Sequence, residues 1–95
     1  MQYAEIYFKD WCPYSQRALR LLDDKGVNYT AIDVTDDPKR EREMRERSGR
    51  TSVPQIFVGD RHVGGFDDLY ALDEAGELDA LFEASTTETP TEKAA

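Results

Sequence analysis

The sequence predicts an α/β fold in which a four-stranded mixed β-sheet is flanked by helices. Short runs rich in aromatic and β-branched residues, typical of strands, alternate with longer amphipathic or charged runs, typical of helices. Proline and glycine lie at the boundaries of these runs, where they begin or end helices. A turn at residues 59–60 joins the last two expected strands and indicates a hairpin. The expected order is β-α-β-α-β-β-α-α.

The first expected strand is residues 3–8, Tyr-Ala-Glu-Ile-Tyr-Phe, which is short and rich in aromatic residues. Pro13 then suits the first turn of a helix, because the N–H that it lacks would have no partner there. We expect this helix to end at Lys25, with Gly26 as its cap. Its apolar face comprises Ala18, Leu19, Leu21 and Leu22.

Residues 29–34 form the second expected strand, and residues 38–48 form a highly charged second helix that opens with proline. Glutamate precedes arginine by four positions twice in this helix, which is the favourable order for ion pairs along a solvated face. The expected pairs are Glu41 with Arg45 and Glu43 with Arg47.

The third and fourth expected strands, residues 55–58 and 62–63, form the hairpin, and two short helices follow at about 67–74 and 77–84. A strand–helix–strand unit gives a right-handed parallel pair, and the hairpin adds antiparallel strands to it. Residues 1–84 therefore form one domain. Residues 85–95, STTETPTEKAA, contain no large apolar side chain, so we expect a disordered tail.

Composition excludes several classes of protein. Lys plus Arg is 12 and Asp plus Glu is 20, for a net charge of -8, which disfavours nucleic-acid binding. The sequence has no run of 18 apolar residues and no signal-peptide pattern at its start, so we expect a cytoplasmic protein without membrane association. Its one cysteine cannot form an internal disulfide or a multi-cysteine metal site within one chain, and we expect no metal.

That cysteine, Cys12, lies between a strand and the helix opened by Pro13. A helix N-terminus favours negative charge, and hence the nucleophilic thiolate. The nearby positive charge of Lys9 favours the thiolate as well, whereas the negative charge of Asp10 opposes it. The competing interpretation is a buried structural cysteine. Ser15 stands three positions later, where a dithiol enzyme would carry its second cysteine. Its hydroxyl can donate a hydrogen bond to the thiolate, and an external thiol must resolve any covalent intermediate.

Three segments resemble the glutaredoxin family, and the resemblance covers about residues 3–82. Residues 11–15, Trp-Cys-Pro-Tyr-Ser, resemble its Cys-Pro-Tyr-Cys active site with serine in the last place. Residues 51–57, Thr-Ser-Val-Pro-Gln-Ile-Phe, are similar to its Thr-Val-Pro-Gln-Ile-Phe strand. Residues 64–69, Gly-Gly-Phe-Asp-Asp-Leu, resemble its Gly-Gly-x-Asp-Asp-Leu segment. Residues 47–50 also resemble small bacterial members.

The resemblance implies a thioredoxin-like fold in which the bond before Pro54 is cis and faces Cys12. It implies that glutathione binds at Lys9, Tyr14, Ser52, Val53, Pro54, Gly65, Phe66, Asp67 and Asp68. Arg47 and Arg50 are weaker candidates for a glutathione carboxylate. Glycine lets the backbone approach a ligand closely, while an aspartate can cap the following helix and also bind an ammonium group.

The implied function is glutathione-dependent thiol–disulfide exchange by a monothiol route through a Cys12–glutathione intermediate. The implied partners are glutathione, as co-substrate, and glutathionylated proteins, with the chain acting as a monomer. The alternative is a homodimeric carrier of a [2Fe–2S] cluster ligated by two chains and two glutathione molecules. A binding module without turnover is a second alternative. A hydrolase pairing Cys12 with His62, the one histidine, is disfavoured because His62 falls on the hairpin.

Two further alternatives stay open at the level of sequence. Ser15 is either the natural residue or a replacement for a cysteine. The natural thiol is either glutathione or a related low-molecular-weight thiol.

Overall fold

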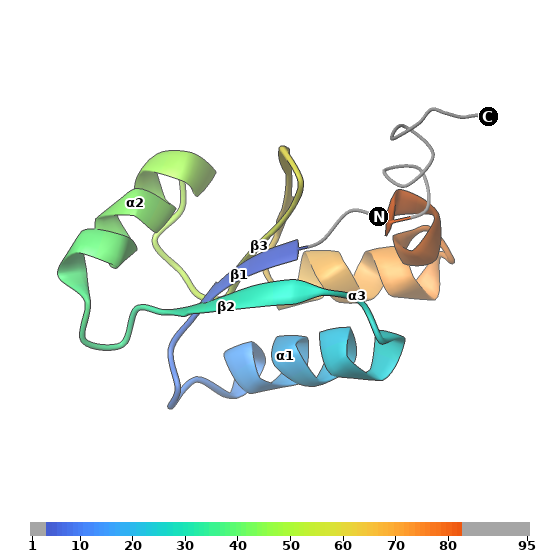
Figure 1. The fold of residues 1–95 in the computed structure, drawn as a ribbon, viewed down its shortest axis with the longest axis horizontal. Helices are drawn as coiled ribbons and strands as arrows, with labels where there is room; N and C mark the ends of the chain where they lie inside the picture. Colours follow the sequence, from blue (N-terminus) through green and yellow to red (C-terminus); the bar gives the residue numbers. More distant parts are fainter. Residues whose placement is uncertain (1–3, 83–95) are drawn as a thin grey trace.

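A four-stranded mixed sheet lies at the centre of the computed structural model, which describes residues 4–82 (Figure 1). Its strands stand in the order β2-β1-β3-β4. They are β1 (Ala4–Phe8), β2 (Tyr29–Asp33), β3 (Gln55–Val58) and β4 (Arg61–Gly64). The helices are α1 (Pro13–Lys25), α2 (Pro38–Ser48) and α3 (Phe66–Glu74), and residues 78–82 are also helical.

Strand pairing confirms the predicted fold class. β1 is parallel to β2 and antiparallel to β3, and β3 is antiparallel to β4. The predicted order of elements is therefore confirmed over the described residues, with small differences in bounds. The second strand ends at Asp33 instead of residue 34, and β4 runs for four residues instead of two. The described part of the last helix falls within the predicted 77–84, whereas the predicted tail, 85–95, lies outside the described residues.

Proline and glycine fix the bounds of α1. The helix begins at Pro13 with Cys12 as its N-cap residue. It ends at Lys25, as predicted, where Gly26 caps it with a φ of 68° and donates its N–H to the Asp23 carbonyl. The left-handed conformation at position 26 is one that glycine adopts without steric penalty. Cys12 is thereby held at the end of a well-bounded helix.

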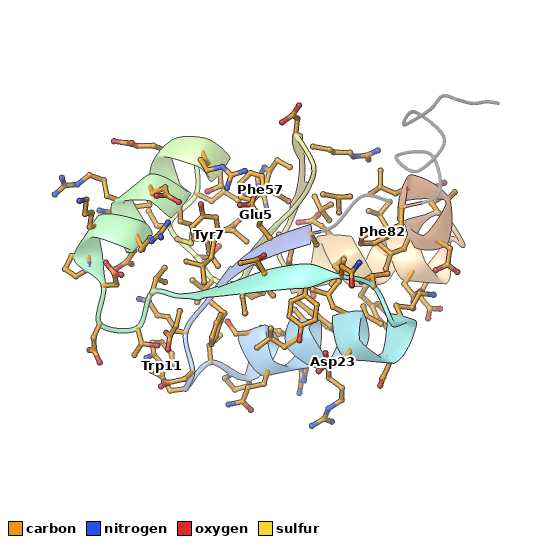
Figure 2. The ribbon with its side chains drawn as sticks, viewed as in Figure 1. Glu5, Tyr7, Trp11, Asp23, Phe57 and Phe82 are labelled. Carbon is orange, nitrogen blue, oxygen red and sulfur yellow. The ribbon has the colours of Figure 1, made fainter. Side chains whose placement is uncertain are left out.

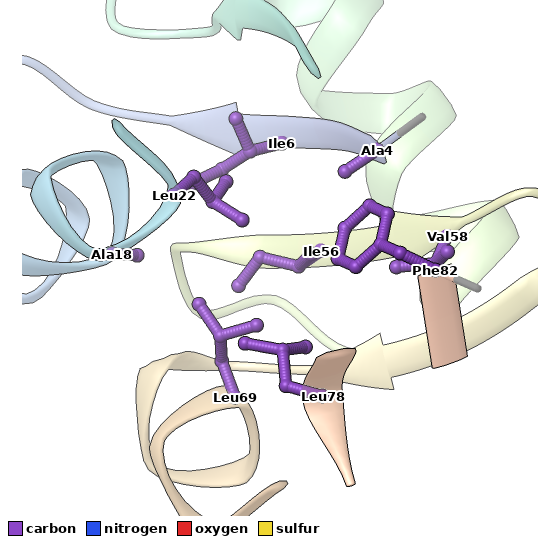
Figure 3. Packing of buried hydrophobic residues seen from close by; sticks show 9 residues of the cluster. All are labelled: Ala4, Ile6, Ala18, Leu22, Ile56, Val58, Leu69, Leu78 and Phe82. Atoms are coloured by element: carbon purple, nitrogen blue, oxygen red, sulfur yellow. The ribbon is translucent and has the colours of Figure 1, made fainter. Parts of the chain in front are cut away.

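Alternation along the strands divides the core between the two faces of the sheet. One face carries the larger cluster, which α1, α3 and residues 78–82 cover (Figure 3). That cluster comprises Ala4, Ile6, Ala18, Leu22, Ile56, Val58, Leu69, Leu78 and Phe82. The opposite face carries a smaller cluster beneath α2, comprising Tyr7, Val34, Met44 and Phe57. In the resulting helix–sheet–helix layering, the end of β1 and the start of β3 lie side by side near the start of α1.

The charged helix α2 binds the sheet through polar contacts that sequence spacing did not predict. Figure 2 labels Glu5 and Tyr7 on β1 near this helix. The buried Tyr7 hydroxyl donates to Glu43 Oε2 at 2.5 Å and accepts from Arg47 at 2.9 Å. Arg47 also pairs with Glu5 at 3.0 Å.

The predicted i,i+4 pairs of α2 are therefore wrong. Glu43 and Arg47 turn toward the Tyr7 hydroxyl, because a buried hydroxyl without partners would be unfavourable. Glu41 pairs with Lys9 at 3.3 Å instead of Arg45. Burial raises the pKa of Tyr7, and the bond to Glu43 adds to the rise. The Tyr7 hydrogen bond in turn lowers the pKa of Glu43.

Candidate active site

Cys12 lies at the junction of β1 and α1, where its thiol faces the loop before β3. Its side chain is almost buried, with a relative exposure of 7%. Sγ lies 3.8 Å from the Val53 carbonyl oxygen and donates to it. The Cys12 N–H donates to the Lys9 carbonyl at 3.1 Å, which closes a tight turn before the helix. The first N–H groups of a helix have no intrahelical partner and favour negative charge, so this position suits a thiolate.

The peptide bond between Val53 and Pro54 is cis, as the sequence resemblance predicted. Its Val53 carbonyl is the group that meets the Cys12 thiol. The cis bond therefore lies beside the cysteine, which was also predicted.

Gln55, which directly follows Pro54, holds this loop from inside the protein. Its side chain is fully buried and donates to the Ser52 carbonyl at 3.0 Å and to Ser52 Oγ at 3.2 Å. Its Oε1 lies 2.8 Å from His62 Nε2. Because the amide nitrogen is used by Ser52, Oε1 accepts and the proton lies on His62 Nε2. Sequence analysis placed Gln55 in a strand but missed this role.

A cavity of ≈ 200 Å³ lies between this loop and the start of α3. It is lined by Tyr14, Arg50, Ser52, Val53, Pro54, Gly65, Phe66, Asp67 and Asp68. Eight of the nine residues predicted to bind glutathione thus surround one cavity, next to the carbonyl that meets Cys12. Lys9 does not line this cavity, whereas Arg50, a weaker candidate, does. Their role in binding stays a prediction.

Asp68 organises the α3 side of the cavity. Its Oδ2 accepts from the Gly65 N–H at 3.0 Å and from Arg50 at 3.1 Å. The Gly65 N–H lowers the pKa of Asp68, and Arg50 lowers it further. The N-cap residue of α3 is Gly65, and Asp68, at the third helical position, caps the helix by accepting the Gly65 N–H, so the predicted capping role is confirmed for Asp68. Phe66 begins the helix earlier than predicted, and Asp68 closes the turn from inside the helix.

Of the two glycines before α3, Gly64 allows close packing around Asp68. Gly64 has a φ of 121°, and a Cβ at this position would lie 2.2 Å from Asp68 Oδ2. A Cβ at Gly65 would lie 3.4 Å from the Pro54 carbonyl oxygen. Gly64 thus leaves room for the Asp68 side chain to fold back over the turn before α3, whereas a Cβ at Gly65 would make only an ordinary contact.

Two residues predicted near the thiolate, and one weaker candidate for a glutathione carboxylate, have other partners. Lys9 Nζ pairs with Glu41 at 3.3 Å and lies over the Trp11 ring. Ser15 is fully buried, and its Oγ accepts from the Lys9 N–H at 3.3 Å. The expected Ser15–Cys12 hydrogen bond is not among the contacts within residues 4–82. Arg47 contacts the α2 side of the sheet, leaving Arg50 as the cation in the cavity lining.

His62 lies on β4, where it bonds to Gln55 and stacks on Phe57 with ring centroids 4.8 Å apart. Burial lowers the pKa of His62, and the nearby Arg50 charge lowers it further. This histidine therefore supports the cavity wall through Gln55 and is not paired with the thiol.

No cluster of three or more His, Cys, Asp or Glu residues suited to a metal occurs within residues 4–82. Over the same described range, no helix has the length and apolarity to span a membrane.

The chain matches the family model of glutaredoxin over residues 4–63. It is 51% identical over 81 residues to glutaredoxin 3 of Escherichia coli strain K12, covering 85% of this chain and 98% of that protein. The solution structure of glutaredoxin from Brucella melitensis is 51% identical, with a TM-score of 0.75 over 85% of this chain and 88% of that one. The crystal structure of a buckwheat glutaredoxin–glutathione complex shares the fold, with a TM-score of 0.79 at 23% identity over 87% of this chain and 78% of that one.

Proposed function

Because the chain belongs to the glutaredoxin family, an oxidoreductase family with the thioredoxin-like fold, we propose that it reduces protein–glutathione mixed disulfides through Cys12 alone. Glutathione is the co-substrate and glutathionylated proteins are the substrates. We propose that the protein acts in the cytoplasm and that it acts as a monomer. The observation that carries this proposal is the lone cysteine, Cys12, held at a helix N-terminus beside the cis-proline loop and its cavity.

In the first step the Cys12 thiolate attacks the glutathionyl sulfur of the mixed disulfide. A bond forms between Cys12 Sγ and that sulfur, the original sulfur–sulfur bond breaks, and the substrate leaves as a thiolate that takes up a proton. The helix N-terminus supports the thiolate before the attack, and the rate rises with the thiolate fraction and with access to the sulfur.

In the second step the thiolate of another glutathione molecule attacks the glutathionyl sulfur on Cys12. Glutathione disulfide leaves and the Cys12 thiolate is restored. The net exchange converts one protein–glutathione mixed disulfide and one glutathione molecule into a free protein thiol and one glutathione disulfide. A free thiol must supply this step because Ser15 cannot form a disulfide.

The cavity offers groups that match the charges of glutathione, which carries an ammonium group and two carboxylates. Asp67 and Asp68 can bind the ammonium group, and Arg50 can bind a carboxylate. Ligand binding would break the Arg50–Asp68 ion pair. Arg50 would then pair with a carboxylate of glutathione, and Asp68 would pair with its ammonium group. The Val53 N–H has no partner within the described residues and can donate to the peptide backbone of glutathione, as in strand addition.

Substitution of the cysteine tests the proposal. The parent chain should reduce a glutathionylated peptide in the presence of glutathione, and Cys12→Ala should lose this activity. Cys12→Ala should still bind glutathione, because the cavity contacts lie outside the thiol. Turnover by Cys12→Ala at the parent's rate would contradict the proposal, whereas binding without turnover by the parent would identify a binding module.

The alternative function, a [2Fe–2S] cluster carrier, would give a different result with the same purified protein. Reconstitution with iron and sulfide would give a brown dimer that absorbs visible light and loses its colour when glutathione is removed. Pro13, which directly follows Cys12 as the first residue of α1, restricts the backbone there and favours the enzyme instead. A colourless monomer that turns over the mixed disulfide would support the enzyme.

A further inference from the structure

An aromatic surface leads away from the glutathione cavity across α3. The ring centroids of Tyr14 and Phe66 lie 6.2 Å apart, and those of Phe66 and Tyr70 lie 5.8 Å apart. Tyr14 is 52% exposed and Tyr70 is 49% exposed. Phe66, between the two exposed tyrosines, is half-buried. Aromatic side chains are enriched in protein–protein interfaces, so this row is a candidate surface for binding a partner.

The row continues into a shallow, mostly apolar groove of ≈ 180 Å³ between α1 and α3. The groove is lined by Arg17, Arg20, Leu21, Asp24, Phe66 and Tyr70. Phe66 also lines the glutathione cavity, so the two depressions share a wall. A substrate with its glutathionyl group in the cavity can therefore extend into the groove.

Two cations of α1, Arg17 and Arg20, line this groove in an otherwise acidic chain. Arg17 lies over the Tyr14 ring at 5.3 Å, and Arg20 stands one helical turn further on. Neither guanidinium forms an ion pair within residues 4–82, unlike Lys9, Lys25, Arg40, Arg47 and Arg50. The other cations without an ion pair in that range, Lys39, Arg42, Arg45 and Arg61, lie outside the groove lining. The two arginines outnumber Asp24 among the charged residues of the lining, although the whole chain carries -8.

We propose that this groove binds the polypeptide of the substrate and selects glutathionylated cysteines followed by an apolar residue flanked by acidic residues. The apolar side chain packs between Phe66 and Tyr70, and the carboxylates pair with Arg17 and Arg20. This inference rests on the proposed function and adds a substrate class to it. Rim charges of this kind contribute to recognition and to the association rate.

Three synthetic peptides test the inference, each carrying one cysteine in a disulfide with glutathione. They differ only after the cysteine, which Glu-Leu-Glu, Gln-Leu-Gln or Lys-Leu-Lys follows. The parent should favour the Glu peptide over the Gln peptide by about fivefold in kcat/KM, as two exposed ion pairs allow, and disfavour the Lys peptide. The preference should shrink at about 1 M salt, where charges are screened beyond about 3 Å.

The double variant Arg17→Gln/Arg20→Gln should lose the preference for the Glu peptide. Arg42→Gln/Arg45→Gln is the matched control, because it makes the same charge change on exposed positions of α2, across the sheet from the groove. This control should keep the preference. A parent that treats the three peptides alike, or equal losses in both double variants, would overturn the inference.

A small mixed disulfide of glutathione and 2-mercaptoethanol separates this inference from the proposed function. Turnover of that compound by the parent without peptide discrimination defeats the inference alone, whereas no turnover of any substrate defeats the proposed function. Sedimentation provides a further readout. A parent dimer that Arg17→Gln/Arg20→Gln converts to monomer would mean that a second copy of the chain occupies the groove, and would overturn the assignment to substrate.

Discussion

Position 15 decides how an adduct on Cys12 is resolved. Ser15 lies one helical turn after Cys12, is fully buried, and accepts a hydrogen bond from the Lys9 N–H. Its hydroxyl stabilises the turn that carries the cysteine, and it cannot displace a bound thiol. In the proposed mechanism the adduct therefore persists until a free thiol reaches it.

The variant Ser15→Cys should change the route of the reaction. A thiol three positions after Cys12 can attack the adduct and release glutathione, leaving a disulfide within the chain. Intact mass measured after transfer, without free glutathione, should show loss of the adduct in Ser15→Cys and its retention in the parent. Thr30→Cys is the control, because it adds an exposed thiol on β2, a strand separate from α1. A Ser15→Cys adduct as persistent as the parent's would contradict this account.

Gly64 is needed for both its backbone conformation and its lack of a side chain. We expect Gly64→Ala to lower the free energy of unfolding by about 1–3 kcal/mol, because a residue with a side chain is strained at a φ of 121°. The added Cβ should also displace the Asp68 side chain and lower the free energy of unfolding further. Gly76→Ala is the matched control, because Gly76 has a φ of 73° but no atom within 4 Å of the added Cβ. Urea unfolding measures both. Equal losses would mean that the Asp68 contact contributes nothing.

At the scale of elements, the loop before β3 depends on the first residue of that strand. Gln55→Leu should lower the free energy of unfolding by about 1–3 kcal/mol, because Ser52 and His62 lose a buried partner. It should also raise the KM for a glutathionylated peptide, since Ser52 and Val53 line the cavity.

Gln16→Leu is the control for Gln55→Leu. It removes an exposed amide that bonds to the Asp10 carbonyl at 2.8 Å, so its cost should be smaller and the KM unchanged. If Gln55→Leu left the KM for the glutathionylated peptide unchanged, the hydrogen bonds of Gln55 would stabilise the fold without contributing to substrate binding.

The elements that the sequence predicted best are those whose signals are local. Pro13 and Gly26 bound α1, and Pro38 opens α2, because each residue restricts or permits a backbone conformation at its own position. The predicted cavity residues likewise came from contiguous motifs, residues 52–54 and 65–68, which the fold brings together.

The contacts that the sequence did not predict depend on partners far along the chain. Arg47 binds Glu5 and Tyr7 because the sheet places them under α2, and no spacing within the helix encodes that. Lys9 is held by Glu41 for the same reason. Gln55 was missed because a polar residue at the start of a strand carries no local sign that it is buried.

Charge on the whole molecule is distributed so that the ion-paired cations of α2 and of the turn after β1 stabilise the fold. Lys9 joins the turn before Cys12 to α2, and Arg47 joins α2 to β1. Arg50 lines the cavity, where its partner Asp68 lies beside it. The chain is acidic, and its cavity still offers a cation to an anionic thiol such as glutathione.

Stability should fall as the pH falls from neutrality. The pKa of His62 in the folded chain lies below the 6.5 of a free side chain, because burial, and then Arg50, disfavour its charged form. The unfolded chain takes up the proton first, so the free energy of unfolding decreases as the pH falls from above 6.5 through the folded pKa. The lowered pKa of Asp68 adds a further loss below about 3.8, as its folded pKa is approached.

Urea unfolding of the parent and of His62→Gln at about pH 7.5 and about pH 5 isolates the histidine contribution. Glutamine keeps a donor for Gln55 but does not titrate. The decrease in stability between the two pH values should be smaller in His62→Gln. The same decrease in both chains would show that His62 does not contribute.

The central claim is that one thiol performs the exchange and an external thiol completes it. Intact-mass measurement of the chain mixed with an excess of glutathionylated peptide, without free glutathione, tests this most directly. We predict one glutathione added to Cys12, one reduced peptide released for each chain, and no further turnover until glutathione is supplied. Continued turnover without glutathione, or an adduct of the peptide instead of glutathione on Cys12, would contradict the claim.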